Sequence, residues 1–572
     1  MPLDIFSRDP HDIRIILTQQ YSSMEVERST WLAHYQDLNR FILPRSGRYL
    51  EFDRNRTSTS KYNAILDSSA TQNVRTAKSG LSTGMSSPAR IWFKLRAKDP
   101  ELNRYQPVRI WLDEVVERMM QVLAGTNVYR DLDRHYGDLL VYGTSCSIQV
   151  SDFETVIHHY PSPVGEFLLG QDNKGRVNTL FRRFNWTTGE VVMEFGRDAV
   201  SESVRQNYDR GNHEAQVTLL HAIRPRYRRD PGKIDNQNMP WESIYMEWGN
   251  SAKRSGLLRV SGFERFPVLA PRWEPNGMDV YGGSPGMDVL GDVKQLQHEQ
   301  QRKGQVIDHQ TDPALALPAE LQDQEVETFP GGRVYVSQLS PHTAIRPLFE
   351  VNLNLDAVRE DILDVRGRIA RGLFEPLFLM LANMPPTRES TAYEIAARKE
   401  EQMLQLGPVL SNLRTELHSP LVQGLFHRML DIGMFPPIPR ELQGSALDIE
   451  YVGLLDQAQK IIGVQNMERF TSSLAAASEF KPEVLDKWNA DEWADDLADR
   501  LGVPADQVVS DEKVRALRAA RAAAQAAQAQ VEAMKTQSEA ARNFSQAQAE
   551  PRPPTSGDPT SIAEAVSSPS GI

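Results

Sequence analysis

The sequence of 572 residues contains one cysteine, Cys146, and this scarcity excludes several classes of protein. A single thiol cannot build an intrachain disulfide framework, and it cannot supply the ligands of a multi-cysteine zinc or iron–sulfur site. A chain without disulfides suits a reducing compartment, which favours the cytoplasm as the place where it is made.

Long apolar runs are absent as well. The richest short stretch covers residues 377–384 and still includes Asn383, whereas a helix that crosses a bilayer needs about 20 apolar residues. The first residues, Met-Pro-Leu-Asp, do not form a basic region followed by an apolar one, so no secretory signal is expected. We therefore expect no membrane partner.

An excess of positive charge is also missing, because 64 basic residues stand against 76 acidic ones and the net charge is −12. Proteins that hold nucleic acid through its phosphates usually carry a basic excess. Tight electrostatic binding of DNA or RNA is thus disfavoured as the main role. An acidic chain can still let DNA slide past it.

The motifs of common catalytic sites do not occur. The glycines of 282–286 open a helix but lack the lysine of a phosphate-binding loop, and there is neither an HExxH zinc motif nor a GxSxG nucleophile motif. His158 and His159 are adjacent, so on a strand they face opposite sides and cannot share a metal. Cys146 is interpreted as a small buried residue rather than a nucleophile. We expect no catalytic residue, no cofactor and no metal, and hence no enzyme.

Two charged clusters have more than one interpretation. For an acidic helix face near the C-terminus, a solvated face is favoured over a cation site. For three alternating arginines on one face of a predicted strand, a solvated face is favoured over an anion-binding stripe. The residues are Asp491, Glu492, Asp495, Asp496 and Asp499 in the first cluster, and Arg224, Arg226 and Arg228 in the second.

Hydrophobic periodicity divides the chain into a helical start, a β-rich middle and a second helical part. Apolar residues three to four apart predict helices over 1–45, 64–84 and 107–125. Residues 140–270 contain short β-branched and aromatic runs between turn residues, which predicts strands. The run 172–175, Asp-Asn-Lys-Gly, is typical of a hairpin turn.

The second helical part begins at Ser284 and Pro285, which form an N-cap followed by proline at the first helical position. Two helices flank a segment rich in proline and glycine, and the apolar stretch that follows them is predicted to be irregular. Thr391 and Glu394 form a capping box for a long helix, which Pro408 and Pro420 are expected to kink. Short helices are predicted over 446–510, an alanine-rich helix that needs neighbours over 511–549, and disorder over 551–572.

Six segments occur in the order found in one known family. They are 80–93 (GLSTGMSSPARIWF), 142–144 (YGT), 161–169 (PSPVGEFLL), 266–273 (FPVLAPRW), 281–290 (YGGSPGMDVL) and 406–417 (LGPVLSNLRTEL). On these segments the chain resembles the head-to-tail connector, or portal, proteins of short-tailed double-stranded DNA bacteriophages. The resemblance runs from about residue 10 to 455.

This resemblance implies an α+β subunit, mainly helical and elongated, that forms a ring of twelve. By position, its parts would be an N-terminal wing (1–283), a first stem helix (284–311), a clip (312–354), a second stem helix (355–373), a tunnel loop (374–389), a long wing helix (390–445), a crown (446–510), a barrel helix (511–549) and a disordered tail (550–572). Twelve copies at −12 each would give the ring about −144 charges, which favours sliding of DNA over adhesion.

The implied function is that of a portal, a channel at one capsid vertex for genome packaging and ejection that joins head to tail. Its partners would be the terminase large subunit, the major capsid protein and scaffold, tail or adaptor proteins, and the double-stranded DNA in the channel. It would act in the virion, and in the host cytoplasm during assembly. The residues expected near DNA are Phe378, Leu379, Met380, Asn383, Met384 and Arg388, and those of the clip that face terminase or adaptor are Glu320, Asp323, Glu325 and Glu327.

Two alternative functions stay open from the sequence. One is another ring-forming or adaptor protein of the virion. The other is a hydrolase that acts on nucleic acid or glycan through paired carboxylates, whose separation a sequence does not give.

Overall fold

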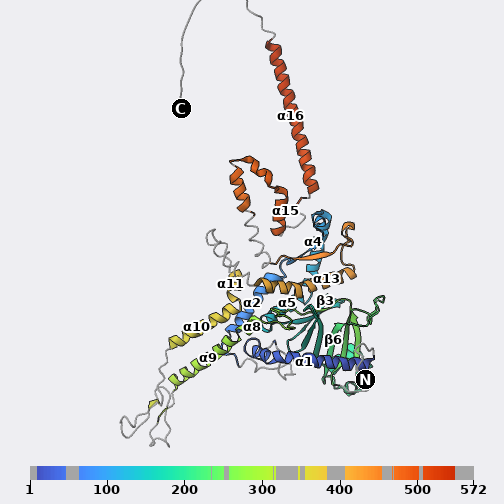
Figure 1. The fold of residues 1–572 in the computed structure, drawn as a ribbon, viewed down its shortest axis with the longest axis vertical. Coiled ribbons are helices and arrows are strands. Elements are labelled where there is room, and N and C mark those ends of the chain that lie inside the picture. The colour runs from blue at the N-terminus through green and yellow to red at the C-terminus, as the bar shows by residue number, and fades with distance from the viewer. Residues whose placement is uncertain are drawn as a thin grey trace, which may run out of the picture. The chain divides into compact units, whose positions relative to one another are not determined.

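The computed structural model describes residues 9–44, 46, 64–233, 235–249, 257–312, 315–316, 346–347, 355–382, 406–453, 467, 469–478, 480–501, 507–509 and 511–547. The chain divides into two compact units, Met1–Val503 and Pro504–Ile572. Helices and antiparallel sheets occur together in the first unit (Figure 1), so the α+β prediction is confirmed.

The N-terminal elements follow the predicted helices closely. Asp9 caps the first helix by accepting a hydrogen bond from the backbone N–H of His11 (2.8 Å), and Pro10 occupies the first helical position. The elements are α1 (Pro10–Phe41), α2 (Ser69–Met85), β1 (Phe93–Ala97), α3 (Pro100–Arg104), α4 (Gln106–Ala124) and α5 (Val128–Tyr142).

The β-rich middle forms two antiparallel sheets. One has the order β3-β2-β9 and the other the order β4-β5-β6-β7-β8. Their strands are β2 (Cys146–Asp152), β3 (Val156–Ser162), β4 (Phe167–Gln171), β5 (Val177–Thr187), β6 (Gln216–Pro225), β7 (Trp241–Glu247), β8 (Leu257–Phe263) and β9 (Val268–Leu269). The predicted turn at 172–175 joins β4 to β5, with Gly175 at φ +74°.

Helices cover both faces of the five-stranded sheet. Leu17 and Tyr21 of α1 pack with Leu220 on one face, and the cluster around Val191 and Leu219 lies on the other. That second cluster includes residues of α6 (Thr188–Phe195) and α7 (Glu202–Asp209). Leu219 and Leu220 serve opposite faces because successive side chains of a strand alternate.

The favoured interpretation of the arginine stripe is wrong for two of its three members. Arg224 is buried, where it pairs with Glu242 on the neighbouring strand and donates to Gln20 of α1 (2.6 Å). The Arg226 guanidinium donates to the carbonyl oxygens of Asn236 (2.9 Å) and Ser261 (2.7 Å). Cross-strand and loop acceptors that are distant in sequence therefore replace the expected water.

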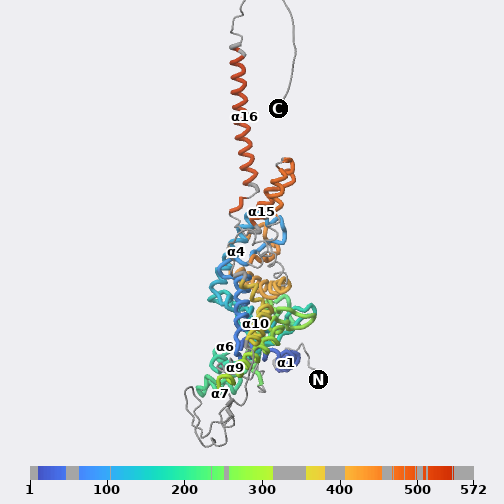
Figure 2. Tube along the Cα trace, turned by 90° about the vertical axis from the view of Figure 1, so that its left-hand side faces the viewer, coloured from blue at the N-terminus to red at the C-terminus, as the bar shows by residue number. Residues whose placement is uncertain are grey.

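Helices occur at both positions predicted for the stem, with one difference in the first. Ser284 caps the first by accepting from the N–H of Met287 (3.1 Å), but a break at Val289 divides it in two. The elements are α8 (Pro285–Asp288), α9 (Leu290–Thr311), β10 (Leu315–Ala316), β11 (Arg346–Pro347) and α10 (Leu355–Gly372). Helices α9 and α10 pack side by side (Figures 1 and 2), and β10 pairs antiparallel with β11.

The prediction of an irregular segment after the second stem helix is wrong for its first half. Residues Glu375–Ala382 form a helix, α11. Its apolar run lacks the polar positions that reveal helical period, and Pro376 is compatible with a first turn. Residues 383–389 lie outside the described part of the chain.

The long wing helix is described from residue 406 onward. It is α-helical over 406–413, π-helical over η3 (Arg414–His418) and α-helical again over α13 (Ser419–Asp431). Pro420 has no N–H to bond the carbonyl of Glu416, and the π turn shifts the pairing so that Ser419 N–H bonds Arg414 O. The expected kink at Pro420 is thus a π turn, whereas the predicted capping box lies outside the described residues.

The helix ends at Asp431, earlier than the predicted limit of 445. A 3₁₀ turn, η4 (Arg440–Leu442), follows, and β12 (Leu447–Tyr451) then pairs with β1. Residues 447–451 were expected to be helical, and this is wrong because β1, more than 300 residues earlier, provides a strand to pair with. The remaining predicted crown contains helix 469–478, η5 (Pro482–Lys487) and α15 (Ala490–Leu501).

The second unit contains the alanine-rich helix α16 (Asp511–Ala547), as predicted. Its larger apolar side chains are exposed, namely Leu517, Val531 and Met534. A helix with this little buried surface is marginal alone in water. The predicted disordered tail lies outside the described residues.

Two left-handed glycines allow a matched test of this fold. Gly143 (φ +71°) ends α5, where a Cβ would overlap the carbonyl oxygens of Gly282 and Gly283, whereas Gly175 (φ +74°) has open space around it. We expect Gly143→Ala to lower the thermal unfolding midpoint severely. Gly175→Ala should cost only the backbone penalty of about 1 kcal/mol. Calorimetry would measure both, and equal shifts would contradict the close approach at Gly143.

Candidate functional site

Helices α9 and α10 are both hydrogen-bonded to the segment that precedes α2. The Gln297 side chain accepts hydrogen bonds from the backbone N–H groups of Leu66 (2.7 Å) and Asp67 (2.8 Å) and donates to Asp67 O (2.9 Å). Asp67 Oδ2 accepts from Arg366 of α10 (2.7 and 3.0 Å) and from Gln300 (3.0 Å). Burial raises the pKa of Asp67, but the hydrogen bonds from Ser69 and Arg366 outweigh it and lower that pKa.

The turn between α10 and α11 is strained and tightly packed. Phe374 has φ +58°, a left-handed conformation that costs an L-residue roughly 1–2 kcal/mol. Just before it, Gly372 lies against Val289 so closely that a Cβ would overlap the valine side chain. The ring of Phe374 packs on Trp273, with centroids 6.1 Å apart.

Helix α11 is docked on α2 through one aromatic side chain. Phe378 is 2% exposed, and its ring lies on Gly80, where a Cβ would be 2.7 Å from the Cβ of Phe378 and nearer still to its ring. Leu377 beside it is also buried. Only a residue without a side chain at position 80 permits this contact.

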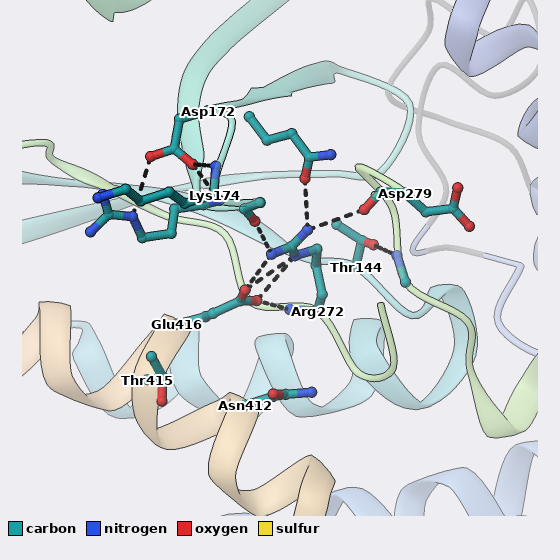
Figure 3. A network of polar contacts seen from close by, with 12 residues as sticks. Thr144, Asp172, Lys174, Arg272, Asp279, Asn412, Thr415 and Glu416 are labelled. Atoms are coloured by element: carbon teal, nitrogen blue, oxygen red, sulfur yellow. Dashed lines mark hydrogen bonds and ion pairs between the residues drawn. The ribbon is translucent and has the colours of Figure 1, made fainter. Parts of the chain in front are cut away.

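Arg272 is the centre of an extensive polar network (Figure 3). Its guanidinium is 5% exposed, and all five of its N–H groups have acceptors. Two contact Glu416 of η3 (2.5 and 3.2 Å) and three bond Gln171 Oε1 (3.2 Å), Asp279 O (3.2 Å) and Gly175 O (2.7 Å). The backbone N–H of Arg272 also donates to Glu416 (2.9 Å). One residue thus ties the β4–β5 turn and the 279 loop to the wing helix.

The strands and turns around Arg272 bring four of the six resemblance segments together. Trp273 N–H donates to Gly143 O (2.8 Å), and Gly282 N–H donates to the Thr144 hydroxyl (2.9 Å). From the wing helix, Asn412 donates to Trp273 O (3.4 Å). These residues belong to segments 142–144, 266–273, 281–290 and 406–417, so the sequence motifs meet at one structural centre.

A second polar cluster, between α5 and β3, is fully buried. Asp131 Oδ2 lies 2.9 Å from His159 Nδ1 and 3.3 Å from His135 Nε2, and that same His135 atom contacts Ser147 Oγ (2.9 Å). Burial raises the pKa of Asp131, but His135, His159 and Arg134 outweigh it and hold that pKa well below its usual range.

This cluster is not arranged as a catalytic triad. Its aspartate and serine contact the same histidine nitrogen, whereas a triad needs the two nitrogens to serve different partners. Ser147 and His135 are also 0% exposed, so no substrate reaches them. Because its serine and histidine are inaccessible to substrate, the cluster does not support the hydrolase alternative.

Other buried titratable groups lie close by. Burial raises the pKa of Asp138 to about 6, against the opposing charge of Arg134. Burial also lowers the pKa of His418 to about 3, with Arg414 and His135 adding to the effect. Burial raises the pKa of the Cys146 thiol, and this residue is 0% exposed, as its interpretation as a buried residue predicts. At pH 7 His418 and Cys146 are therefore neutral core residues, whereas Asp138 is mainly ionised and pairs with Arg134 (2.6 Å).

Within the described residues, no three His, Cys, Asp or Glu side chains are placed so that they could hold a metal ion. Among the helices of that same part of the chain, none is both long and apolar enough to cross a membrane.

The predicted DNA-facing residues do not share one environment. Phe378 packs on α2 and is 2% exposed, whereas Leu379 is 40% exposed, and the placement of both near DNA stays a prediction. Met380 lies in α11. The other predicted residues lie outside the described part of the chain, namely Asn383, Met384 and Arg388 of the tunnel segment, and Glu320, Asp323, Glu325 and Glu327 of the clip.

Sequence reasoning missed Asp67, Arg272, Phe374 and Glu416 as members of a site. Two of them lie inside quoted resemblance segments, Arg272 in 266–273 and Glu416 in 406–417. A buried-charge argument applied to those segments would have singled them out. An arginine that lies between a proline and a tryptophan is expected to be buried, and a buried arginine needs an acidic partner.

Comparison with known proteins agrees with this picture. The family model described as bacteriophage head to tail connecting protein matches residues 16–509. A "Probable portal protein" of Bordetella phage BPP-1 is 43% identical over 89% of this chain and 91% of its own. The "Portal protein" of Salmonella phage epsilon15 is 39% identical over 88% of this chain and 90% of its own.

Among solved structures, a chain from the neck of an empty gene transfer agent particle covers 73% of this chain and 94% of its own. Its TM-score is 0.33 at 12% identity, which is too low to support an argument about the fold.

The chain belongs to the family of bacteriophage head-to-tail connecting proteins. Its function is that of a portal, and its place is the virion of a bacteriophage. The names of its relatives indicate no catalytic activity.

The Arg272–Glu416 pair gives a direct test of the site. Glu416→Gln leaves a buried guanidinium without its counter-charge, so we expect a loss of about 3 kcal/mol in stability. The exposed pair Arg197–Asp209 provides the control, because Asp209→Asn removes a charge that water already solvates. Calorimetry of both variants should show a much larger shift for Glu416→Gln. Matching shifts would mean that Arg272 does not depend on this partner.

Proposed function

We propose that twelve copies of this chain form a ring at one capsid vertex, with a central channel through which the genome is packaged and ejected. The observation that carries this proposal is the pair α9 and α10 in a chain of the head-to-tail connecting family. Their buried residues are confined to one end of each helix, Leu290 to Gln297 in α9 and Ile362 to Ile369 in α10. The opposite ends are exposed and lead to the paired strands β10 and β11.

In this proposal α9 and α10 are the stem, and residues 312–354 between them are the clip. The exposed apolar residues Ile307 and Leu363 on these helices would contact neighbouring copies. The exposed Leu517, Val531 and Met534 of α16 would pack in the same way into a helical barrel, which supplies the neighbours that this helix lacks.

The channel is assigned to α11 and the segment after it. Leu379, Met380, Asn383, Met384 and Arg388 are proposed to lie near DNA, whereas buried Phe378 anchors the segment. The acidic balance of the chain, −12 per copy, would weakly repel phosphates and so let a motor move the DNA. Terminase, which carries the ATPase, and later the tail or adaptor proteins would dock at the clip. The ring would assemble with scaffold and capsid protein in the host cytoplasm.

Electron microscopy with a light-scattering mass tests the ring. We expect a particle with a central hole and a mass near twelve times 64.6 kDa, about 775 kDa. Rings of eleven or thirteen copies would still support the proposal, since overexpressed rings can close imperfectly. A compact monomer or dimer that persists when scaffold and capsid protein are present would contradict it.

Charge reversal tests the clip. We expect the fourfold variant of Glu320, Asp323, Glu325 and Glu327 to Lys to weaken terminase binding and genome packaging, because a basic partner surface would then meet like charge. The matched control reverses Asp491, Glu492, Asp495 and Asp499 of the crown, an equal change in net charge. Packaging that is unchanged in the clip variant, or equally reduced in both, would refute the clip assignment.

A further inference from the structure

Helices α10 and α11 follow one another in the chain (Figure 1), and their junction has a strained residue between two close contacts. Phe374 is held left-handed at φ +58°, at a position after a helix end where glycine is usual. Gly372 fits against Val289 on one side of it, and Phe378 fits on Gly80 on the other. A residue stays in such a conformation only where the packing around it determines it.

We propose that Phe374 is a strained hinge and that the contact of Phe378 with Gly80 is the catch that keeps α11 docked on α2. When the catch opens, Phe374 relaxes and α11 swings away from α2. Because α11 is the first half of the predicted tunnel segment, this movement would regulate the channel. That role rests on the proposed function, whereas the hinge itself does not.

The backbone penalises both positions of α11. The docked state carries the strain of Phe374. A relaxed Phe374 in the right-handed region would continue α10 into α11, but Pro376 has no N–H for the carbonyl of Gly372, and its ring would crowd that carbonyl. Each state therefore has a backbone cost, and side-chain packing decides between them.

Packing makes the docked state the major one. Leu377 and Phe378 are 3% and 2% exposed when α11 is docked, and both would meet water on release. The released state is thus a minor population in the isolated chain, which is the range where a single substitution changes it measurably.

The hinge is also connected to the wing helix. The ring of Phe374 lies on Trp273, the residue after Arg272, and Asn412 of the wing helix donates to Trp273 O. Asp67 and Arg366 fix the other end of the arrangement, where α10 meets the start of α2. A shift of α10 against the wing helix would therefore act on Phe374.

Thiol labelling in the full-length protein measures the released population. A Leu377→Cys variant places a thiol that is covered when α11 is docked, and the rate of maleimide labelling reports its exposure. Cys146 does not interfere, because it is buried and its pKa is raised. The parent protein, labelled in parallel, verifies this.

The first comparison opens the catch. Gly80→Ala places a methyl group into the ring of Phe378, so we expect labelling at position 377 to accelerate at least ten-fold. Gly367→Ala is the matched control, because this glycine of α10 has open space around it. Equal labelling rates in the two variants would overturn the catch.

The second comparison relieves the strain, and it holds even if Gly80→Ala fails to fold. Phe374→Gly and Phe374→Ala both lose the contact with Trp273, but only glycine adopts the left-handed conformation without penalty. We expect labelling to be about five-fold slower in Phe374→Gly than in Phe374→Ala. Identical rates would overturn the hinge.

A last measurement separates the hinge from the portal function. Labelling needs only the purified chain, whether or not it forms rings, so a failed ring test leaves the hinge result valid. Genome packaging by particles that carry Gly80→Ala tests the regulatory role. Faster labelling with unchanged packaging would overturn that role and leave the portal function intact.

Discussion

The ion pair between buried Arg272 and partly buried Glu416 is the interaction on which the rest of this structure depends. A guanidinium at 5% exposure is tolerated only if every N–H has an acceptor and a carboxylate balances the charge. Those acceptors come from the β4–β5 turn, the 279 loop and the wing helix, so the requirement of one side chain fixes three elements. The wing helix supplies the carboxylate from a π turn. This turn contains Glu416, and it also accommodates Pro420, which follows directly in α13.

Around that centre, α2 connects parts that are far apart in the sequence. The segment before it is held to α9 and α10 by Asp67 and Gln297, and its middle carries α11 through Gly80. Polar contacts thus fix the start of α2, whereas the apolar contact of Phe378 with Gly80 holds α11. Directional bonds resist sliding, and an apolar contact is non-directional. The arrangement is therefore rigid where α9 and α10 meet the start of α2, and easier to change at α11.

Much of this could be predicted from sequence because it is local. Helical periodicity located α1, α2, α4 and α10, the alanine-rich composition located α16, and the Asp-Asn-Lys-Gly run located the β4–β5 turn. What failed depends on partners remote in the chain. Arg224 and Arg226 were expected in water because Glu242 and the loop carbonyls cannot be seen from their own strand. Strand β12 needed β1, and the left-handed Phe374 needed the packing of Trp273 and Val289.

Several titratable groups with strongly perturbed pKa values lie in the core of the described residues. Catalytic sites place perturbed acids and bases where a substrate reaches them. Here the groups with strongly perturbed pKa values are buried in the core, namely Asp131, Asp138 and His418. Arg134 pairs with both aspartates, and Tyr136 contacts His418. Their hydrogen bonds and those of their neighbours link α5, the three-stranded sheet and the wing helix. Phe374, one of two non-glycine residues at positive φ among the described residues, lies instead at the junction of α10 and α11. The perturbed titratable groups therefore hold core elements together, whereas this backbone strain lies between two helices, where only the surrounding packing maintains it.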